Sequence, residues 1–159
     1  MMETVVKRNP KFYLPEKFRN IIVNFICYSF ILLFLYTATS KLLDYSNSKL
    51  QMSESPIITD FASMLVWLIP SIEIIIAVSL FFSKTRLIGL YASLVLMVMF
   101  TIYIYSILNF SYYIPCSCGG VISKLSWNQH LVFNLVWILF AISGILLKSN
   151  QTIDGDEAS

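Results

Sequence analysis

Two cysteines separated by a single residue, Cys116 and Cys118, are the side chains best suited to chemistry in this chain. They lie in the run Pro-Cys-Ser-Cys-Gly-Gly at 115–120. Cysteines at this spacing can close a small, strained disulfide ring, and strain makes such a bond easier to reduce. The flanking Pro and Gly are typical of a tight turn. We therefore interpret the pair as a redox-active dithiol that exchanges disulfides with a partner in an oxidising compartment.

Two other interpretations of this cysteine pair stay open. The cysteines could be small, unreactive residues of a loop. They could also belong to a metal site, but Cys116, Cys118 and the single histidine, His130, supply at most three ligands. Structural zinc usually takes four ligands at recognisable spacing, so we expect no metal.

His130 and Glu73 are further candidates, both for proton chemistry. His130 is expected one turn into the last helix, where an imidazole that titrates near physiological pH could accept a thiol proton. The plainer interpretation, which we favour slightly, is an interfacial histidine bonded to headgroups or to the preceding loop. Glu73 follows Pro70 by three residues in the body of an apolar segment. An acid at that depth usually faces the interior of a bundle, where it could relay protons, bind a ligand or bond across helices.

Lys41 lies near the end of the first apolar segment, three residues before Asp44. The two side chains could pair at this helical spacing. We predict instead that Lys41 extends its ammonium group to the lipid headgroups. Three asparagines in or beside apolar segments are expected to hydrogen-bond between helices: Asn24, Asn109 and Asn134.

The elements that must position these residues are membrane spans. Of the 159 residues, 57% are hydrophobic and only 13% are charged, which is too apolar for an ordinary soluble domain. A transmembrane helix needs about 20 apolar residues to cross a hydrocarbon core about 30 Å thick. Four segments meet this need: 21–43, 57–82, 87–110 and 127–147. Because open sheets cannot satisfy their backbone in lipid, we predict an all-α bundle of four transmembrane helices, preceded by a basic segment (1–20) and followed by an acidic tail (148–159).

The positions of Lys and Arg predict the orientation of this bundle. With the N-terminus in the cytoplasm, most of the eleven basic residues lie on the cytoplasmic side, and the outer loops hold only Lys41, Lys49 and Lys124. Both termini are therefore predicted to be cytoplasmic, with Cys116 and Cys118 on the outer face. The partner surface is the lipid bilayer, and because the basic residues are few and flank the spans, we expect no nucleic-acid partner.

Three motifs, in this order, resemble the methylamine-utilisation protein E (MauE) group of the DoxX-like redox-associated membrane proteins. They are Ser-Lys-Leu-Leu-Asp at 40–44, Pro-Ser-Ile-Glu-Ile-Ile-Ile-Ala at 70–77 and Cys-Ser-Cys-Gly-Gly at 116–120. The resemblance covers about residues 20–148. The chain departs from it at 37–40, where Thr-Ala-Thr-Ser stands in place of the glycines expected in the first span.

The resemblance implies a bacterial inner-membrane protein associated with thiol-disulfide chemistry. Proteins similar to it support disulfide formation or the maturation of an exported enzyme, often beside a thioredoxin-like partner. The family's cysteines map onto Cys116 and Cys118, its lysine onto Lys41 and its glutamate onto Glu73.

Our favoured hypothesis is a component of a thiol-disulfide oxidoreductase system in the inner membrane. Cys116 and Cys118 would exchange disulfides with a periplasmic thioredoxin-like protein or an exported client. Because such a relay needs a terminal electron acceptor or donor, a quinone in the bundle is a candidate cofactor, with Glu73 or His130 handling protons.

Two alternative functions remain. The chain could be a non-catalytic factor for the maturation or assembly of an exported enzyme, with the cysteine pair bracing a docking loop. It could also be a small transporter, which Glu73 and Pro70 within one span would suit. The short chain and the lack of an inverted repeat argue against transport.

Overall fold

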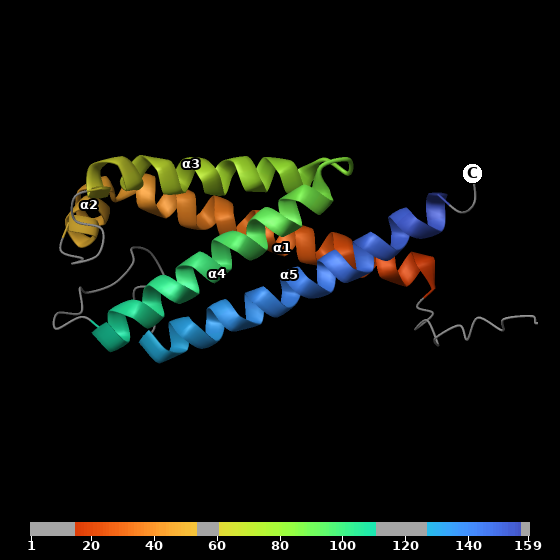
Figure 1. Ribbon diagram of the computed structural model, residues 1–159. Helices are drawn as coiled ribbons and strands as arrows, with labels where there is room; N and C mark the ends of the chain where they lie inside the picture. Colours follow the sequence, from red (N-terminus) through yellow and green to blue (C-terminus); the bar gives the residue numbers. More distant parts are fainter. Residues whose placement is uncertain (1–14, 54–60, 111–126, 157–159) are drawn as a thin grey trace, which may run out of the picture.

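The computed structural model describes residues 15–53, 61–110 and 127–156, which fold into helices joined by short turns. Figure 1 shows four long helices running up and down beside one another, with a short helix at one end. The helices are α1 (Glu16–Leu43), α2 (Tyr45–Ser53), α3 (Ala62–Phe81), α4 (Arg86–Phe110) and α5 (Trp127–Asp156). We name the two ends of the bundle for what lies there. The α2 end holds the ends of α1 and α4 and the starts of α3 and α5, and the Arg86 end is the opposite one.

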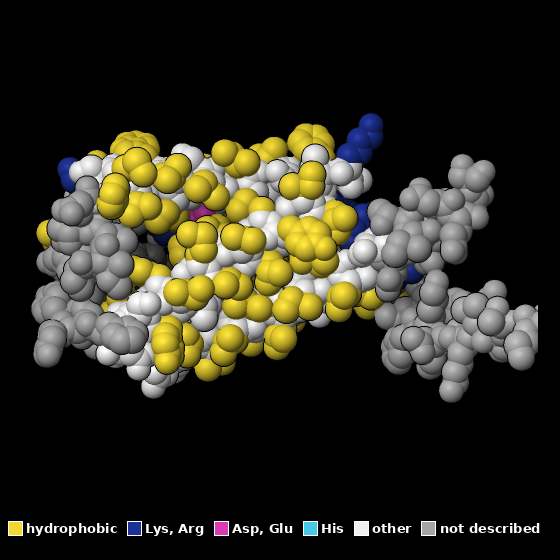
Figure 2. All heavy atoms as spheres, in the orientation of Figure 1, with side chains coloured by type: hydrophobic (Ala, Val, Ile, Leu, Met, Phe, Trp, Pro, Cys, Tyr) yellow, Lys and Arg dark blue, Asp and Glu magenta, His cyan; other side chains and the backbone are white. Residues whose placement is uncertain are grey.

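Each of the four long helices is long and apolar enough to cross a membrane. A helix satisfies its own backbone hydrogen bonds, which is what a chain in lipid requires. Figure 2 shows apolar side chains covering the flank of the bundle, with Lys and Arg toward its two ends. Many of these large apolar side chains are exposed, among them Leu32, Ile75 and Leu139. The prediction of an all-α bundle with four spans is confirmed.

The boundaries of the helices differ from the predicted segments where polar residues extend a helix beyond the lipid. Helix α1 begins at Glu16, before the predicted start at 21, and α5 continues to Asp156, past the predicted end at 147. The structure also contains α2, in a polar stretch that we expected to be a loop. The Tyr45 ring lies 5.5 Å from that of Trp67 in α3, and Ser48 is buried. Packing of this kind, which short-range sequence patterns do not reveal, stabilises short helices.

The long helices associate as two pairs, α1 with α3 and α4 with α5. In Figure 1 the two pairs lie apart at the α2 end and approach each other toward the Arg86 end. Aromatic rings join them in the middle, where the Phe30 ring lies 5.7 Å from that of Phe34 and 4.7 Å from that of Trp137. Trp137 of α5 therefore packs against α1.

Small residues and paired polar groups hold the helices together at the Arg86 end. A Cβ added at Gly144 would lie 3.2 Å from Leu90 Cδ2 and 3.3 Å from Ile26 Cγ2, so glycine allows α1, α4 and α5 to approach closely. Arg86 donates hydrogen bonds to the Asn24 side-chain oxygen in α1 and to the Leu80 carbonyl in α3. These contacts bind three helices at the turn between α3 and α4.

The asparagines follow the prediction only in part. Asn24 bonds between helices, as expected. Asn109 does not, because its amide donates to the Tyr105 carbonyl one turn earlier in the same helix, at 2.8 Å. The expectation of an interhelical bond was wrong for Asn109, because its exposed side chain reaches a backbone carbonyl of its own helix.

Candidate functional site

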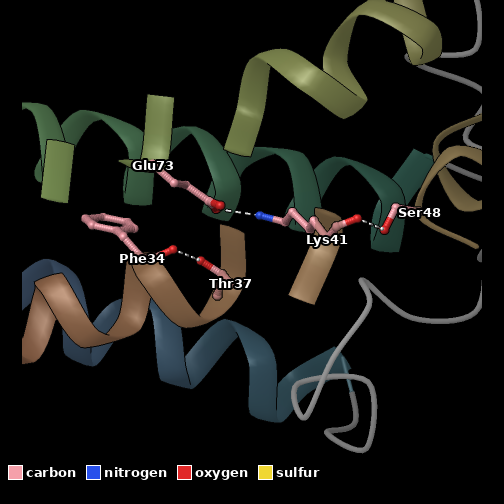
Figure 3. A network of polar contacts seen from close by, with 5 residues as sticks. All are labelled: Phe34, Thr37, Lys41, Ser48 and Glu73. Atoms are coloured by element: carbon pink, nitrogen blue, oxygen red, sulfur yellow. Dashed lines mark hydrogen bonds and ion pairs between the residues drawn. The ribbon is translucent and has the colours of Figure 1, made fainter. Parts of the chain in front are cut away.

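A buried ion pair between two spans forms the centre of the candidate site. Lys41, in the last turn of α1, donates to Glu73 Oε1 in the middle of α3 (Figure 3). The side chains of Lys41 and Glu73 are 15% and 1% exposed, respectively. The prediction that Lys41 extends to the headgroups was wrong. An acid buried within a span is stabilised by an opposite charge, and the lysine stem is long enough to supply it from the neighbouring helix.

Local contacts hold the Lys41 segment in place. The carbonyls of the last turn of a helix lack partners within the helix. The Ser48 hydroxyl of α2 supplies one by donating to the Lys41 carbonyl at 3.3 Å. One turn before Lys41, the Thr37 hydroxyl donates to the Phe34 carbonyl at 3.1 Å and lies next to Glu73 in Figure 3. The polar side of α1 therefore faces α3 at this level.

Helices α4 and α5 complete the surroundings of the lysine. The Lys41 ammonium lies 5.3 Å from the centre of the Phe100 ring of α4, within the range of a cation–π interaction. His130 of α5 lies near enough to interact with the charge of Lys41. Side chains of α3 and α4 thus contact the ammonium group at the end of α1.

Several buried polar atoms in this region have no hydrogen-bond partner among the described residues: Glu73 Oε2, His130 Nδ1 and Asn134 Nδ2. Glu73 is 1% exposed and Asn134 is 2% exposed, so neither side chain reaches solvent or lipid headgroups. Leaving such an atom unpaired costs about 1–3 kcal/mol. Buried polar atoms are nearly always bonded, so each exception points to a partner outside the described residues, such as another part of the chain, a water or a ligand.

The polar atoms lie beside a series of aromatic rings. His130 and Asn134 are four residues apart and share one face of α5. The Phe133 ring lies 6.4 Å from the His130 ring and 5.9 Å from that of Trp137. Trp137 in turn contacts Phe30 of α1. The site therefore combines hydrogen-bonding groups with flat apolar surfaces.

Cys116 and Cys118 lie outside the described residues. The segment 111–126 that carries the cysteines connects the end of α4 to the start of α5. Both of these helix termini are at the α2 end, the end where Lys41 lies. Cys27 of α1 is buried.

Sequence reasoning selected Lys41, Glu73 and His130 separately but did not predict that they share one site. The available signal was a basic and an acidic residue in two consecutive antiparallel spans, but Asp44 offered Lys41 a nearer partner in the sequence. Phe100 was missed because nothing distinguishes it from the many other aromatic residues. Within the described ranges, no three His, Cys, Asp or Glu side chains gather as a metal site requires.

Comparison with known proteins identifies one family. The family model described as methylamine utilisation protein MauE matches residues 19–147, a range that includes every site residue named above. No curated protein and no solved structure matches the chain.

Proposed function

Because the chain belongs to the MauE family, we propose that it is the membrane component of a maturation system for an exported protein and that it acts by disulfide exchange at Cys116 and Cys118. One observation supports this proposal more than any other. The buried Lys41–Glu73 pair and the unpaired polar atoms all lie toward the end of the bundle from which the cysteine segment departs. A protein that only scaffolds a complex has no need for such groups, which are costly within a membrane.

The distribution of basic residues supports an outward position for this end in a bacterial inner membrane. There the cysteines would meet an oxidising compartment and exported proteins. A thiolate of a thioredoxin-like partner or client attacks one sulfur of the Cys116–Cys118 disulfide and forms a mixed disulfide, releasing the other cysteine as a thiolate. The partner's second thiol then attacks the mixed disulfide. The partner leaves oxidised, and two electrons remain on the Cys116/Cys118 dithiol; the same steps in reverse reduce a partner.

Single cysteine substitutions test this exchange directly. In a Cys27→Ala background, Cys116→Ser or Cys118→Ser removes the resolving thiol, so one of the two variants should accumulate a mixed disulfide with its partner. Non-reducing electrophoresis followed by mass spectrometry of the adduct would identify the partner. The double variant Cys116→Ser/Cys118→Ser should form no adduct and should stop maturation. Maturation at the wild-type rate in the double variant would contradict the proposal, and retained client binding would then favour the non-catalytic assembly factor.

A further inference from the structure

The Arg86 end of the bundle carries an excess of positive charge. The basic side chains described there are Lys17, Arg19, Lys84, Arg86 and Lys148. Among the described side chains at this end, only Glu16 is acidic, and it is exposed. Lys17 and Lys84 are exposed as well, but the other three basic side chains are partly buried. Burial of a charge is costly unless an opposite charge accompanies it, so an anion beside these three is favourable.

Two of the partly buried cations border one seam between α1, α4 and α5. Gly144 of α5 lies against Leu90 of α4 and Ile26 of α1. Side chains four residues apart on a helix share a face. Arg86 is one turn from Leu90, and Lys148 is one turn from Gly144, both toward the Arg86 end. The two cations therefore lie just beyond the close contact of the three helices.

Further observations on α1 agree with this placement. The Cys27 side chain is buried, and Arg86 and Lys148 both lie near enough to interact with it electrostatically. Arg19 precedes Ile26 by two helical turns, so it lies on the face of α1 that borders the same seam. The start of α1, the start of α4 and the end of α5 all lie at this end of the bundle (Figure 1). We name Arg19, Arg86 and Lys148 the seam cations.

The bonds of Arg86 hold its guanidinium group in place without neutralising it. Its Nε donates to the Leu80 carbonyl, and its Nη1 donates to Asn24 Oδ1. Both acceptors are uncharged, and a guanidinium group has more N–H donors than these two bonds use. Guanidinium groups bind phosphate oxygens well, because their donors match the geometry of the anion. Arg86 is therefore fixed in position with charge and donors left for a phosphate.

Apolar side chains beside the seam cations favour a lipid over a soluble anion. Ile21 of α1, Ile88 of α4 and Leu146 of α5 are exposed, and each lies two residues from a seam cation. Figure 2 shows Lys and Arg side chains at this end adjoining the apolar flank of the bundle. A phospholipid can contact both kinds of surface at once, with its head group at the cations and its acyl chains on the flank. A soluble phosphate gains nothing from the apolar side chains.

We propose that the seam between α1, α4 and α5 at the Arg86 end binds the phosphate of an anionic phospholipid. Arg86 and Lys148 bond to the phosphate oxygens, and Arg19 adds electrostatic attraction. The bound lipid joins three helices and stabilises the folded state. The distribution of Lys and Arg predicts a cytoplasmic position for this end, so the lipid belongs to the inner leaflet. This binding does not depend on disulfide exchange, because the cysteine segment departs from the opposite end.

The test is a titration of the purified full-length chain, in a neutral detergent, with phosphatidylglycerol or with phosphatidylcholine. The rise in unfolding temperature measures binding, and native mass spectrometry identifies the bound lipid. We expect saturable stabilisation by phosphatidylglycerol and none by phosphatidylcholine. Lys148→Gln should weaken the affinity for phosphatidylglycerol about tenfold, as expected for one lost hydrogen bond from a charged group. Arg86 is left intact, because its bonds also hold the helices together.

Lys84→Gln is the matched control, because it removes the same charge from an exposed position at the same end. It should change the affinity by no more than about twofold. Lys148→Arg keeps the charge and should keep the affinity, which separates lost binding from lost folding.

The proposal is overturned if phosphatidylcholine stabilises the protein equally or if Lys148→Gln binds phosphatidylglycerol like wild type. An equal loss of affinity in Lys84→Gln would show a diffuse effect of charge and would overturn it too. Equal stabilisation by inorganic phosphate alone would mean that the seam takes a soluble anion. Binding that appears only in Asp154→Asn/Asp156→Asn/Glu157→Gln would show that the acidic tail, and not a lipid, neutralises the seam cations.

Discussion

The two ends of the bundle use polar residues within the membrane in opposite ways. At the Arg86 end, Arg86 bonds to Asn24 and to the Leu80 carbonyl, and the Thr85 hydroxyl donates to the Ser79 carbonyl at 2.7 Å. At the α2 end, Glu73 uses one oxygen for Lys41, and its other oxygen has no hydrogen-bond partner among the described residues. The same classes of side chain join the helices at one end and remain available for a ligand at the other.

The contacts that stabilise the fold and the groups that we assign to function therefore lie at opposite ends of the bundle. Paired polar groups and the close approach at Gly144 stabilise the Arg86 end. The α2 end is less stable than it could be, because its unpaired buried atoms raise the free energy of the folded state. Proteins commonly tolerate such a cost where a site must bind something. Changes at the Arg86 end should therefore affect folding first, and changes at the α2 end should affect binding and chemistry first.

The largest effect on stability is expected from breaking the Lys41–Glu73 pair. Lys41→Met or Glu73→Leu alone leaves a buried charge without its partner, which should lower the free energy of unfolding by about 3–5 kcal/mol. The double variant Lys41→Met/Glu73→Leu removes both charges and should return to within about 1 kcal/mol of wild type. Equilibrium unfolding in mixed micelles measures these differences.

The double variant also sharpens the comparison between the two ends. It should fold as wild type does, because it leaves no buried charge without a partner. If the double variant is as unstable as either single variant, the pair is not an isolated ion pair and the account of the α2 end is wrong.

A smaller effect on stability is expected from Arg86→Leu at the opposite end. This change removes hydrogen bonds from a charged group to Asn24 and Leu80, so unfolding should become easier by about 1.5–3 kcal/mol. Lys84→Leu, at an exposed position in the same turn, should have little effect. Mixed-disulfide formation should be unchanged in both variants. Loss of mixed-disulfide formation in folded Arg86→Leu would mean that the two ends do not have separate roles.

The smallest effect is expected from Ser48→Ala, which tests the contact between α2 and α1. Loss of the bond to the Lys41 carbonyl should cost about 0.5–1.5 kcal/mol, measured as a small decrease in unfolding temperature. Ser46, which is exposed in the same helix, provides the control in Ser46→Ala. Equal unfolding temperatures for the two variants would show that α2 does not support the end of α1.

The spans were predictable from sequence because lipid imposes a simple rule of length and polarity on each segment separately. The position of Lys41 was not predictable in this way. Its partner, Glu73, lies 32 residues away in another helix, and spacing within one helix pointed only to Asp44 and the headgroups. Helix α2 was missed for a related reason, because its contacts with α3 and not its own apolar pattern stabilise it. What the sequence could not supply was the set of contacts between helices.

The most direct test of the central claim is the accessibility of Cys116 and Cys118 in intact cells. A membrane-impermeant maleimide would be applied before and after mild reduction, in a Cys27→Ala background that leaves these two thiols alone. The account predicts labelling from outside only after reduction, which would establish a disulfide on the outer face at the α2 end. Labelling that requires a permeabilised membrane would place this end in the cytoplasm. Free labelling without reductant, by thiols that also do not oxidise, would show that the pair does not form a disulfide. Either of these results would contradict the proposed exchange with exported proteins.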